Sequence, residues 1–391
     1  MTSHHHTTIS YISYNLNFIT NGEVLKMNNY RVGIIGCGRI ASTMEDESDV
    51  HPISIAGAFD TLPNTTMVSA CNRSRDKLEA FGQRWGVDSL YQDYTQMLAG
   101  ENLDIVCVAT HPPLHQEMVV AAAQSGIKGV FCEKPMALDL AACEAMIQAC
   151  ERADIPLLIN CSRRWSDEYQ AAKDLLDSGA LGPLLHLVGH CQGCKPSPDW
   201  VADTEGPLLH DAVHTFDILR FFAGEVTSVL GTAKRRKRHQ FPVEDTSYCL
   251  LQFENGGDGV VISNELTQYE RWDIELQCEK GVLRLGFGRG LWVAEPIEFE
   301  SGSWWNLTPQ KFPEPAHSAD RSETSVLQAA KDLIESIENQ SQPRCNGDDG
   351  YKAVEIIMAI YESERRGNSW VNLPLGVKDS LVEILQREGK L

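Results

Sequence analysis

The sequence predicts an α/β protein in which a doubly wound parallel sheet comes first and a second α/β domain with a mostly antiparallel, open sheet follows. Three observations predict this class. Short Val/Ile-rich runs alternate with helical patterns up to about residue 161, the spacing changes after residue 162, and an Asn-Gly-Gly turn at residues 255–257 then joins two strand-like runs. Buried parallel strands read as continuous apolar runs, whereas tight hairpin turns indicate antiparallel pairing.

The expected elements follow from the same patterns. Strands of the first sheet are expected at 31–35, 67–71, 104–110, 128–132 and 156–161, with an acidic insertion at 42–53 in the first crossover. In the second domain we expect helices at 167–178 and 208–222 and strands at 184–190, 226–232, 246–253, 259–265, 273–278 and 282–285. Helices at 321–338, 350–365 and 378–388 complete the chain.

Length and charge limit the partners. The chain has 391 residues, enough for two domains, and 34 basic against 54 acidic residues give a net charge of −20. Such a surface disfavours nucleic acid and anionic lipid, and no apolar stretch approaches the roughly 20 residues that span a bilayer. We therefore expect a small-molecule substrate and a homo-dimer or homo-tetramer formed through the open sheet, with no nucleic acid and no membrane as partner.

The cysteines and the first residues indicate the compartment. Twelve cysteines in a chain of this length are far fewer than in disulfide scaffolds, and several lie inside apolar runs, so we expect the reducing environment of the cytoplasm. Residues 1–26 lack the basic and apolar regions of a secretory signal, and Met27 is a possible start. The expected organisation is a flexible extension at 1–28, a dinucleotide-binding domain at 29–161, and a domain for substrate binding and oligomerisation at 162–391.

A glycine-rich loop follows the first strand directly. Residues 36–41 read Gly-Cys-Gly-Arg-Ile-Ala, the G-x-G-x-x-A pattern of a Rossmann dinucleotide site. Gly36 permits the tight turn, Gly38 lets the backbone approach a pyrophosphate, and the helix that starts with Arg39 and Ile40 presents its N–H groups to the phosphates. The loop therefore predicts that NAD or NADP binds here.

The end of the second strand bears on the choice between the two cofactors. An acidic residue at this point favours NAD, and a nearby arginine favours NADP. The strand ends at Asn72 with Arg73 directly after it. Neither side chain repels a 2′-phosphate, and Arg73 can pair with one, so we expect a slight preference for NADP, although Asn72 also suits the plain ribose of NAD.

Four further motifs occur in a characteristic order. Thr110-His111-Pro112-Pro113-Leu114-His115 follows one strand, Glu133-Lys134-Pro135 ends the next, Arg163-Arg164-Trp165 comes later, and Gly206 to Asp217 reads GPLLHDAVHTFD. Together with the glycine loop, this order resembles the Gfo/Idh/MocA oxidoreductases, which include glucose-fructose oxidoreductase and inositol dehydrogenase. The resemblance covers residues 29–373, and Glu-Lys-Pro at a strand end is its most specific element.

The resemblance implies roles for residues of the first domain. Lys134 would lie beside the nicotinamide and hydrogen-bond the reacting hydroxyl, and Glu133 would support the cofactor side. The peptide bond before Pro135 is expected to be cis. The nicotinamide-ribose region would be lined by Thr110, Pro112, His115 and by His111, which stands where the family usually has proline.

In the second domain the resemblance implies that His214 is the catalytic histidine. Four residues before it, better-known members carry an aspartate, whereas this chain has His210, followed by Asp211; both are candidates for substrate contact and for tuning His214. Arg164 and Trp165 match an Arg-aromatic pair that lies near the substrate in the family.

Helical spacing supports part of this picture independently. His210, His214 and Asp217 fall on one face of a helix. Removing hydride from a secondary alcohol requires a group that accepts the hydroxyl proton, and a histidine with an ordinary pKa of about 6.5 suits that task near neutral pH. A neighbouring lysine such as Lys134 stabilises developing alkoxide charge.

The sequence thus predicts an NAD(P)-dependent oxidoreductase that transfers a hydride between the nicotinamide and a secondary alcohol of a sugar, sugar derivative or cyclitol. Two alternatives stay open: an NAD-dependent glycoside hydrolase of the same fold and a non-catalytic nucleotide or ligand sensor. His210-Asp211-x-x-His214 and Cys191-x-x-Cys194 resemble metal sites, but no metal is expected. We interpret the basic run at 234–238 as an exposed hairpin. Trp304 and Trp305 fit either an interface or a core.

Overall fold

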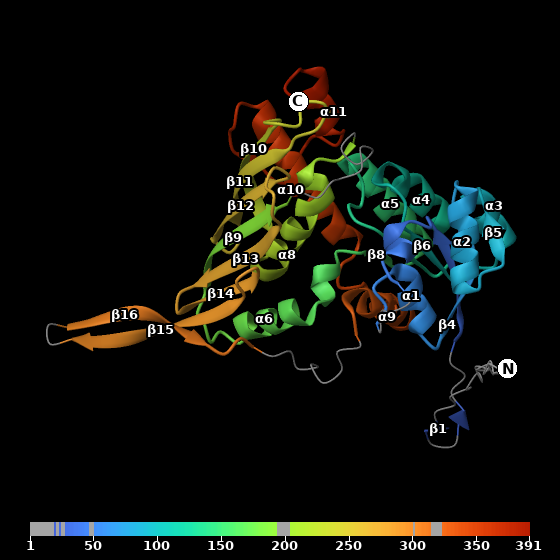
Figure 1. The fold of residues 1–391 in the computed structure, drawn as a ribbon, viewed down its shortest axis with the longest axis horizontal. Coiled ribbons are helices and arrows are strands. Elements are labelled where there is room, and N and C mark those ends of the chain that lie inside the picture. The colour runs from blue at the N-terminus through green and yellow to red at the C-terminus, as the bar shows by residue number, and fades with distance from the viewer. Residues whose placement is uncertain are drawn as a thin grey trace, which may run out of the picture.

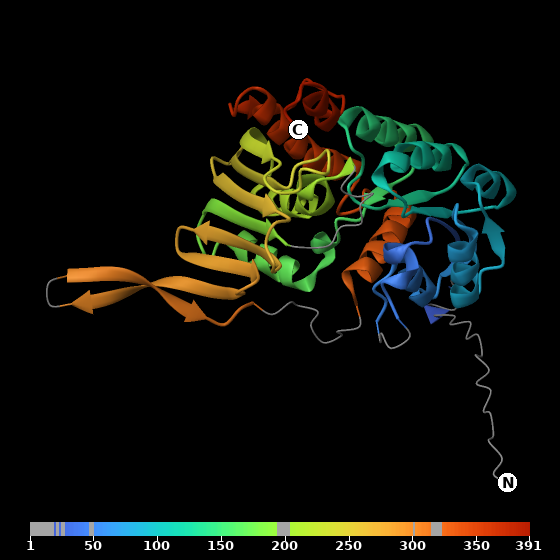
Figure 2. The ribbon, with the colours of Figure 1, turned by 45° about the horizontal axis from the view of Figure 1, so that its top comes forward.

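The computed structural model describes residues 19–20, 23–24, 28–46, 51–193, 204–299, 302–313 and 323–391. Within this part of the chain, two large sheets lie side by side with helices between and around them (Figures 1 and 2). The predicted α/β class is confirmed. Much of the expected extension at 1–28 lies outside the described residues, apart from the short pair β1 (Ile19–Thr20) and β2 (Glu23–Val24).

The first sheet has six parallel strands in the order β5-β4-β3-β6-β7-β8. The strands are β3 (Tyr30–Ile35), β4 (Thr65–Cys71), β5 (Ser89–Tyr91), β6 (Ile105–Val108), β7 (Gly129–Cys132) and β8 (Leu157–Ile159). The helices are α1 (Ile55–Thr61), α2 (Arg75–Trp85), α3 (Tyr94–Gly100), α4 (His115–Gln124) and α5 (Leu140–Ala153). Ligands of such sheets bind at the carboxyl ends of the strands, where the order reverses beside β3.

The acidic insertion of the first crossover is present. A short helical turn, η1 (Arg39–Thr43), follows the glycine loop, and α1 begins only at Ile55. Glu45 ties the two ends of the insertion together, since its Oε2 accepts hydrogen bonds from the backbone N–H groups of Ile53 (2.9 Å) and Ser54 (3.0 Å). Glu45 therefore holds the described start of the insertion against the residues that begin α1.

The second sheet has nine strands in the order β16-β15-β14-β13-β9-β12-β11-β10-β17. These are β9 (Leu184–Gln192), β10 (Val226–Lys234), β11 (Thr246–Phe253), β12 (Asp258–Asn264), β13 (Arg271–Cys278), β14 (Gly281–Gly286), β15 (Gly290–Phe299), β16 (Gly302–Gln310) and β17 (Val371–Asn372). Among these described strands, only β12 and β9 pair in parallel. The helices α6 (Asp167–Asp177), α8 (Val213–Ala223) and α10 (Gly347–Arg365) cover one face, and no described helix lies on the other face, which we call the open face (Figure 2).

Several strands were not expected from the sequence, among them the edge strands β5 and β17 and the hairpin β15–β16. The edge strand β5 was not expected, because three residues are too few to show a period. The hairpin β15–β16 was also not expected, and it projects from the molecule (Figure 1). Its strands lack the alternation of apolar and polar residues on which strand prediction depends.

The C-terminal helices join the two halves. α9 (Ser325–Asn339) packs on the first sheet, where its Leu333 and Ile337 lie against Gly129 of β7. α10 is buried along most of its length and contacts α5, α8, β8 and β10. α11 (Leu381–Arg387) packs on α10. The packed helices therefore fill the region between the two sheets. They hold the strand ends of the first sheet against the helices of the second. No described helix meets the length and hydropathy needed to cross a membrane.

Candidate active site between the two domains

The glycine loop has the geometry that a dinucleotide site needs. Gly36 has φ +100°, and a Cβ at this position would lie 2.5 Å from the carbonyl oxygen of Ala109, so only glycine fits between β3 and β6. Around Gly38, by contrast, a Cβ would meet no atom within 4 Å. The backbone at Gly38 is thus open to a ligand, and Arg39 and Ile40 follow at the surface with Arg39 exposed. The loop fits a pyrophosphate.

Asn72 supports this loop from the end of β4. Its Oδ1 accepts a hydrogen bond from the backbone N–H of Cys37 (3.3 Å), and its Nδ2 donates to the carbonyl oxygen of Ser74 (3.1 Å). Arg73, the next residue, is exposed. The side chain expected to contact the adenosine ribose therefore also fixes the glycine loop.

The loop after β6 contains two partly exposed residues and leads to a buried histidine. Thr110 and His111 are partly exposed, Pro112 is buried, and burial lowers the pKa of His111. His115 has no exposed surface, and its ring nitrogens lie 3.1 Å from the carbonyl oxygens of Thr110 and Pro135. A side chain so enclosed has no surface for a ribose, so we do not retain His115 as a direct cofactor contact; it holds the two loops together.

Lys134 follows β7 and contacts the second domain. The Lys134–Pro135 peptide bond is cis, as expected. Lys134 Nζ donates a hydrogen bond to the backbone carbonyl oxygen of His210 in the second domain (2.7 Å). Glu133 is buried and accepts a hydrogen bond from Asn160 Nδ2 (2.6 Å); burial raises the pKa of Glu133, while Asn160 and Lys134 oppose the rise.

The histidines come from the opposite side. A short helical turn, η4 (Leu208–Ala212), runs directly into α8, so that His210, Asp211 and His214 follow one another on a continuous helical path. His210 and His214 are half-buried and Asp211 is buried. The structure therefore brings Lys134 against the turn that precedes His214, at the carboxyl edge of the nucleotide-binding sheet.

Comparison with known proteins identifies the family to which this chain belongs. Residues 30–160 match the family described as "Oxidoreductase family, NAD-binding Rossmann fold", and residues 169–284 match the "GFO/IDH/MocA C-terminal domain". The chain belongs to the Gfo/Idh/MocA oxidoreductases. It is thus an NAD(P)-dependent oxidoreductase with a dinucleotide-binding Rossmann domain.

Curated relatives and a solved structure agree with this assignment. A D-apiose dehydrogenase from Paraburkholderia graminis is 30% identical over 364 residues, covering 90% of this chain and 92% of the relative. A myo-inositol 2-dehydrogenase from Thermotoga maritima is 26% identical over 85% of this chain and 96% of the relative. An oxidoreductase from Agrobacterium radiobacter, solved with NAD+, L-tartaric acid and magnesium, is 25% identical with a TM-score of 0.73, covering 88% and 98% of the two chains.

One residue of the site was missed from the sequence. Glu205 is buried, and its Oε2 lies 3.3 Å from Nδ1 of His210. Within the described part of the chain, its other oxygen, Oε1, is buried and has no hydrogen-bond partner. His210 occupies the position at which better-known family members carry an acid, and Glu205 brings a carboxylate to that histidine from five residues earlier. This spacing matches no helical repeat, so no periodic pattern indicated it.

Arg164 and Trp165 are placed differently from the expectation. Trp165 has no exposed surface, and its Nε1 donates a hydrogen bond to Asp332 of α9 (2.9 Å). Arg164 is buried and pairs with Asp217 and Asp349, each at 2.9 Å. Groups that are enclosed and fully engaged have no surface for a substrate, so we do not retain the substrate-contact role for either residue.

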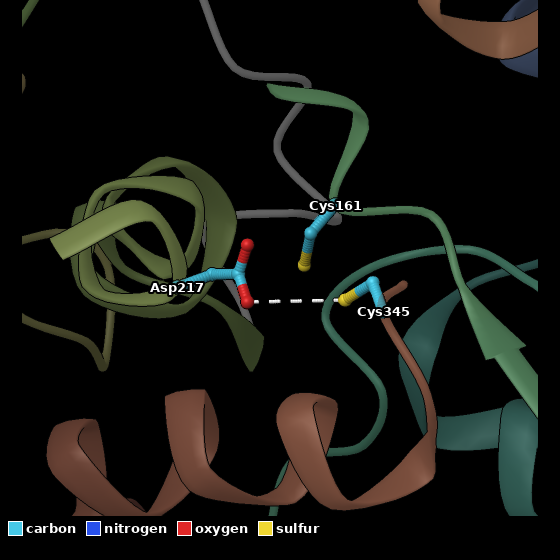
Figure 3. Close-up of side chains that lie close together, drawn as sticks. All are labelled: Cys161, Asp217 and Cys345. Carbon is cyan, nitrogen blue, oxygen red and sulfur yellow. Dashed lines mark hydrogen bonds between the residues drawn. The ribbon is translucent and has the colours of Figure 1, made fainter. Parts of the chain in front are cut away.

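The chemistry of one buried cluster does not suit a metal ion. Ligand atoms of Cys161, Asp217 and Cys345 lie within 4.8 Å of one another (Figure 3). Both carboxylate oxygens of Asp217 already accept hydrogen bonds from Arg164 Nε (3.0 Å each), and burial raises the pKa of the Cys345 thiol well above its usual range. A guanidinium beside the carboxylate would repel a metal cation, so we interpret the cluster as packing around the ion pair.

Two further motifs of the sequence are the basic run at 234–238 and the cysteine pair Cys191-x-x-Cys194. In the basic run at 234–238, the carboxylate of Asp245 accepts hydrogen bonds from the backbone N–H groups of residues 236–238, while Lys234 pairs with Glu364 and Arg238 with Glu265. The run is thus a turn neutralised largely by its own acids. Cys191 is buried, and Cys194 lies outside the described residues.

Truncation of Asp217 tests the buried ion cluster. Asp217→Ala leaves the Arg164 guanidinium without its fully buried partner, so we expect the free energy of unfolding to fall by about 3–5 kcal/mol. Urea denaturation measures the change. Asp177→Ala removes an exposed partner of Lys173 and should cost less than about 1 kcal/mol. Equal small losses in both variants would contradict a stabilising role of the cluster.

Glu244 supports the turn that leads to His210, and its raised pKa makes the stability of the protein depend on pH. Glu244 accepts hydrogen bonds from the backbone N–H of Leu208 (3.1 Å) and from Tyr361 Oη (2.8 Å), and burial raises its pKa from 4.5 to about 7. Between these values the folded chain binds more protons than the unfolded chain, so this residue lowers stability as pH rises.

In Glu244→Gln the titrating group is absent. We therefore expect the free energy of unfolding to decline less between pH 5 and pH 8 than in the unmodified protein, by about 2 kcal/mol. Urea denaturation across this range measures the difference between the two proteins. Parallel pH profiles would contradict the raised pKa.

Proposed function

We propose that this oxidoreductase transfers a hydride between its nicotinamide cofactor and a secondary alcohol of a sugar, sugar derivative or cyclitol. The observation that carries the proposal is the contact between Lys134 Nζ and the carbonyl oxygen of His210, which places a cationic donor between the nucleotide-binding sheet and the helix of His214. The relatives named as apiose and inositol dehydrogenases support the substrate class.

The chain's own residues supply the proton chemistry. When bound, the nicotinamide accepts or returns the hydride. Lys134 has three N–H donors and uses one on His210, so the others are available to orient the substrate oxygen and to stabilise negative charge on it. His214 exchanges the hydroxyl proton as general acid/base, and Asp211 and His210 tune it.

Glu205 extends this assignment to a positioning residue. Its contact with Nδ1 fixes the ring of His210, whose backbone carbonyl in turn holds Lys134. Glu205 is buried and so is its Oε1, so we assign it to holding His210 and not to direct contact with the substrate.

For the cofactor we propose a slight preference for NADP. The support is the same as in the sequence: the uncharged Asn72 follows β4 directly, and the exposed Arg73 comes next. An arginine at this point suits a 2′-phosphate, whereas NAD binding depends on the ribose hydroxyl alone.

We also propose that the protein is a cytoplasmic homo-oligomer. Eleven cysteines lie in the described residues, and all are buried as small apolar groups, which suits a reducing compartment. The open face of the second sheet exposes Tyr248, Leu250 and Val260 by 38–44%, and association of two such faces would remove this apolar surface from water.

A substrate panel tests the reaction. D-Apiose, myo-inositol, levoglucosan, aldoses, uronates and sugar phosphates are each incubated with NAD or NADP, and the absorbance of the reduced nicotinamide is recorded. We expect turnover with at least one polyol or sugar. Release of an aglycone without net cofactor reduction would instead support a glycoside hydrolase, and cofactor binding without any turnover would support a sensor.

Substitution of the proposed general acid/base tests the mechanism. With the best substrate of the panel, His214→Asn should lower kcat by about 10²–10⁴ while cofactor affinity stays unchanged. His239→Asn, at an exposed histidine outside the site, serves as control and should behave like the unmodified protein. Unchanged kcat in His214→Asn would refute the assignment.

Glu205→Gln tests the positioning residue at constant size. Loss of charge-assisted hydrogen bonds should lower kcat/KM about 10- to 100-fold, with no change in melting temperature. Exposed Glu254→Gln is the matched control. A melting temperature that falls together with activity would show a merely structural role.

A further inference from the structure

Glu244 is a buried acid just before β11 that the proposed chemistry does not use. It is 2% exposed, and among the described residues it forms no ion pair. Buried carboxylates usually lie against a cation, because removing a charge from water is costly. In Glu244, hydrogen bonds to both oxygens take the place of the cation. The partners in these hydrogen bonds therefore show what the acid does.

The two carboxylate oxygens of Glu244 bind two different parts of the fold. Oε1 accepts a hydrogen bond from the backbone N–H of Leu208, the first residue of η4 (3.1 Å), and Oε2 accepts one from Tyr361 Oη of α10 (2.8 Å). Tyr361 has no exposed surface, and α10 is buried along most of its length. Glu244 therefore fixes the start of η4 relative to a helix of the core.

Gly206 shows how closely this carboxylate approaches the backbone before η4. A Cβ at position 206 would lie 2.2 Å from Cδ and from Oε1 of Glu244. Because that distance is far below van der Waals contact, glycine is required at this position. The carbonyl oxygen of Gly206 in turn accepts a hydrogen bond from the backbone N–H of His210 (2.9 Å). The position of Glu244 thus affects the backbone of His210 through both Leu208 and Gly206.

The turn that Glu244 contacts is wider than a turn of an α-helix. Residues Leu208–Ala212 form a single π-helical turn, which we call the wide turn, and it runs directly into α8. Such turns are rare and occur frequently at functional sites. Within the wide turn, the carbonyl oxygen of His210 accepts the hydrogen bond from Lys134 Nζ (2.7 Å). Since this shape is rare in helices, contacts from outside the helix have to stabilise it, and Glu244 provides one.

A second buried acid contacts the wide turn through a side chain. Glu205 Oε2 lies 3.3 Å from Nδ1 of His210, whereas Glu244 binds the backbone of the turn. The two acids are thus next to Gly206, one along the chain and one in space. Together they restrain both the ring and the backbone of His210, and Glu244 in addition connects the turn to α10.

We propose that Glu244 is a positioning residue of the active site, which acts on Lys134 and His214 through the wide turn. Its carboxylate stabilises the shape in which the carbonyl oxygen of His210 meets Lys134 and α8 follows with His214. Groups that exchange a proton and orient a substrate oxygen must be held precisely, because small displacements cost much of the rate. The inference rests on the proton chemistry proposed above and adds the residue that places its two groups.

Two variants on opposite sides of the same contact test the proposal. Glu244→Gln keeps the size of the side chain but cannot accept both hydrogen bonds, because its NH2 group only donates. With the best substrate of the panel, kcat should fall about 10- to 100-fold, while the dissociation constant of the cofactor changes less than about threefold. Gly206→Ala places a methyl group against the carboxylate and should have the same effect. The two changes together should cost little more than either alone, since both break one contact.

Glu355→Gln is the matched control. Glu355 is also fully buried and accepts a backbone N–H, that of Leu375 (2.8 Å), but its contact is with the C-terminal segment and not with the wide turn. We expect it to lower the melting temperature and to leave kcat unchanged. If kcat falls equally in Glu355→Gln and Glu244→Gln, the effect is a general loss of packing and the positioning role is refuted.

Nuclear magnetic resonance of the histidine rings provides a readout that needs no turnover. The ring signals of His210 and His214, assigned by substitution, should shift in Glu244→Gln and in Gly206→Ala, while the signal of His239 stays in place. Unchanged signals of His210 and His214 would refute the hold of Glu244 on the wide turn. Shifted signals with an unchanged kcat would refute its role in the reaction.

Circular dichroism verifies that each variant is folded. If Glu244→Gln does not fold, Tyr361→Phe takes its place: it removes the anchor on α10, leaves the hydrogen bond to Leu208, and should shift the same histidine signals. If the panel finds no substrate, the histidine signals still decide whether Glu244 sets the wide turn. Failure of the proposed reaction is therefore distinguishable from failure of this inference.

Discussion

The site depends on one buried ion cluster that joins three parts of the fold. Arg164 follows the last strand of the nucleotide-binding sheet, Asp217 lies on α8, and Asp349 lies in the first turn of α10. Burial lowers the pKa of Arg164, but the two carboxylates more than reverse this, so the guanidinium stays charged. A further N–H donates to the carbonyl oxygen of Arg344 (2.8 Å). Removing Asp217 would leave the buried guanidinium of Arg164 without its fully buried partner, which makes the arrangement costly to break.

The cluster explains how two domains form one site. Asp217 is three residues after His214 on α8, so fixing one fixes the direction of the other relative to the first sheet. On the opposite side, His115 holds the loops that carry Thr110 and Pro135, and Lys134 reaches across to the carbonyl oxygen of His210. The residues that we propose to do chemistry are thus partly exposed, while the residues that place them are buried. Such a division is expected where a reacting group must be held by packing.

The charge near the cofactor loop differs from the net charge of the chain. The chain carries −20, yet its cofactor is an anion; open backbone at Gly38 and the nearby arginines Arg39 and Arg73 provide local attraction. The most basic segment, 234–238, does not contribute, because Asp245, Glu265 and Glu364 neutralise much of it in place. An acidic overall charge therefore disfavours extended anionic partners such as nucleic acid but does not prevent binding of a small phosphate-bearing ligand.

The sequence by itself determined the fold class, the glycine loop, the position of Asn72 and the helical path from His210 to His214, whereas the family resemblance implied the cis peptide before Pro135. Each of these depends on a short segment whose pattern is set by neighbours along the chain. Tertiary structure alone decided that Trp165 and His115 are enclosed, that Arg164 pairs with Asp217 and Asp349, and that Glu205 faces His210. It also decided that β15 and β16 project from the molecule. Burial and the partner of a charge depend on segments far apart in sequence, so no local pattern encodes them.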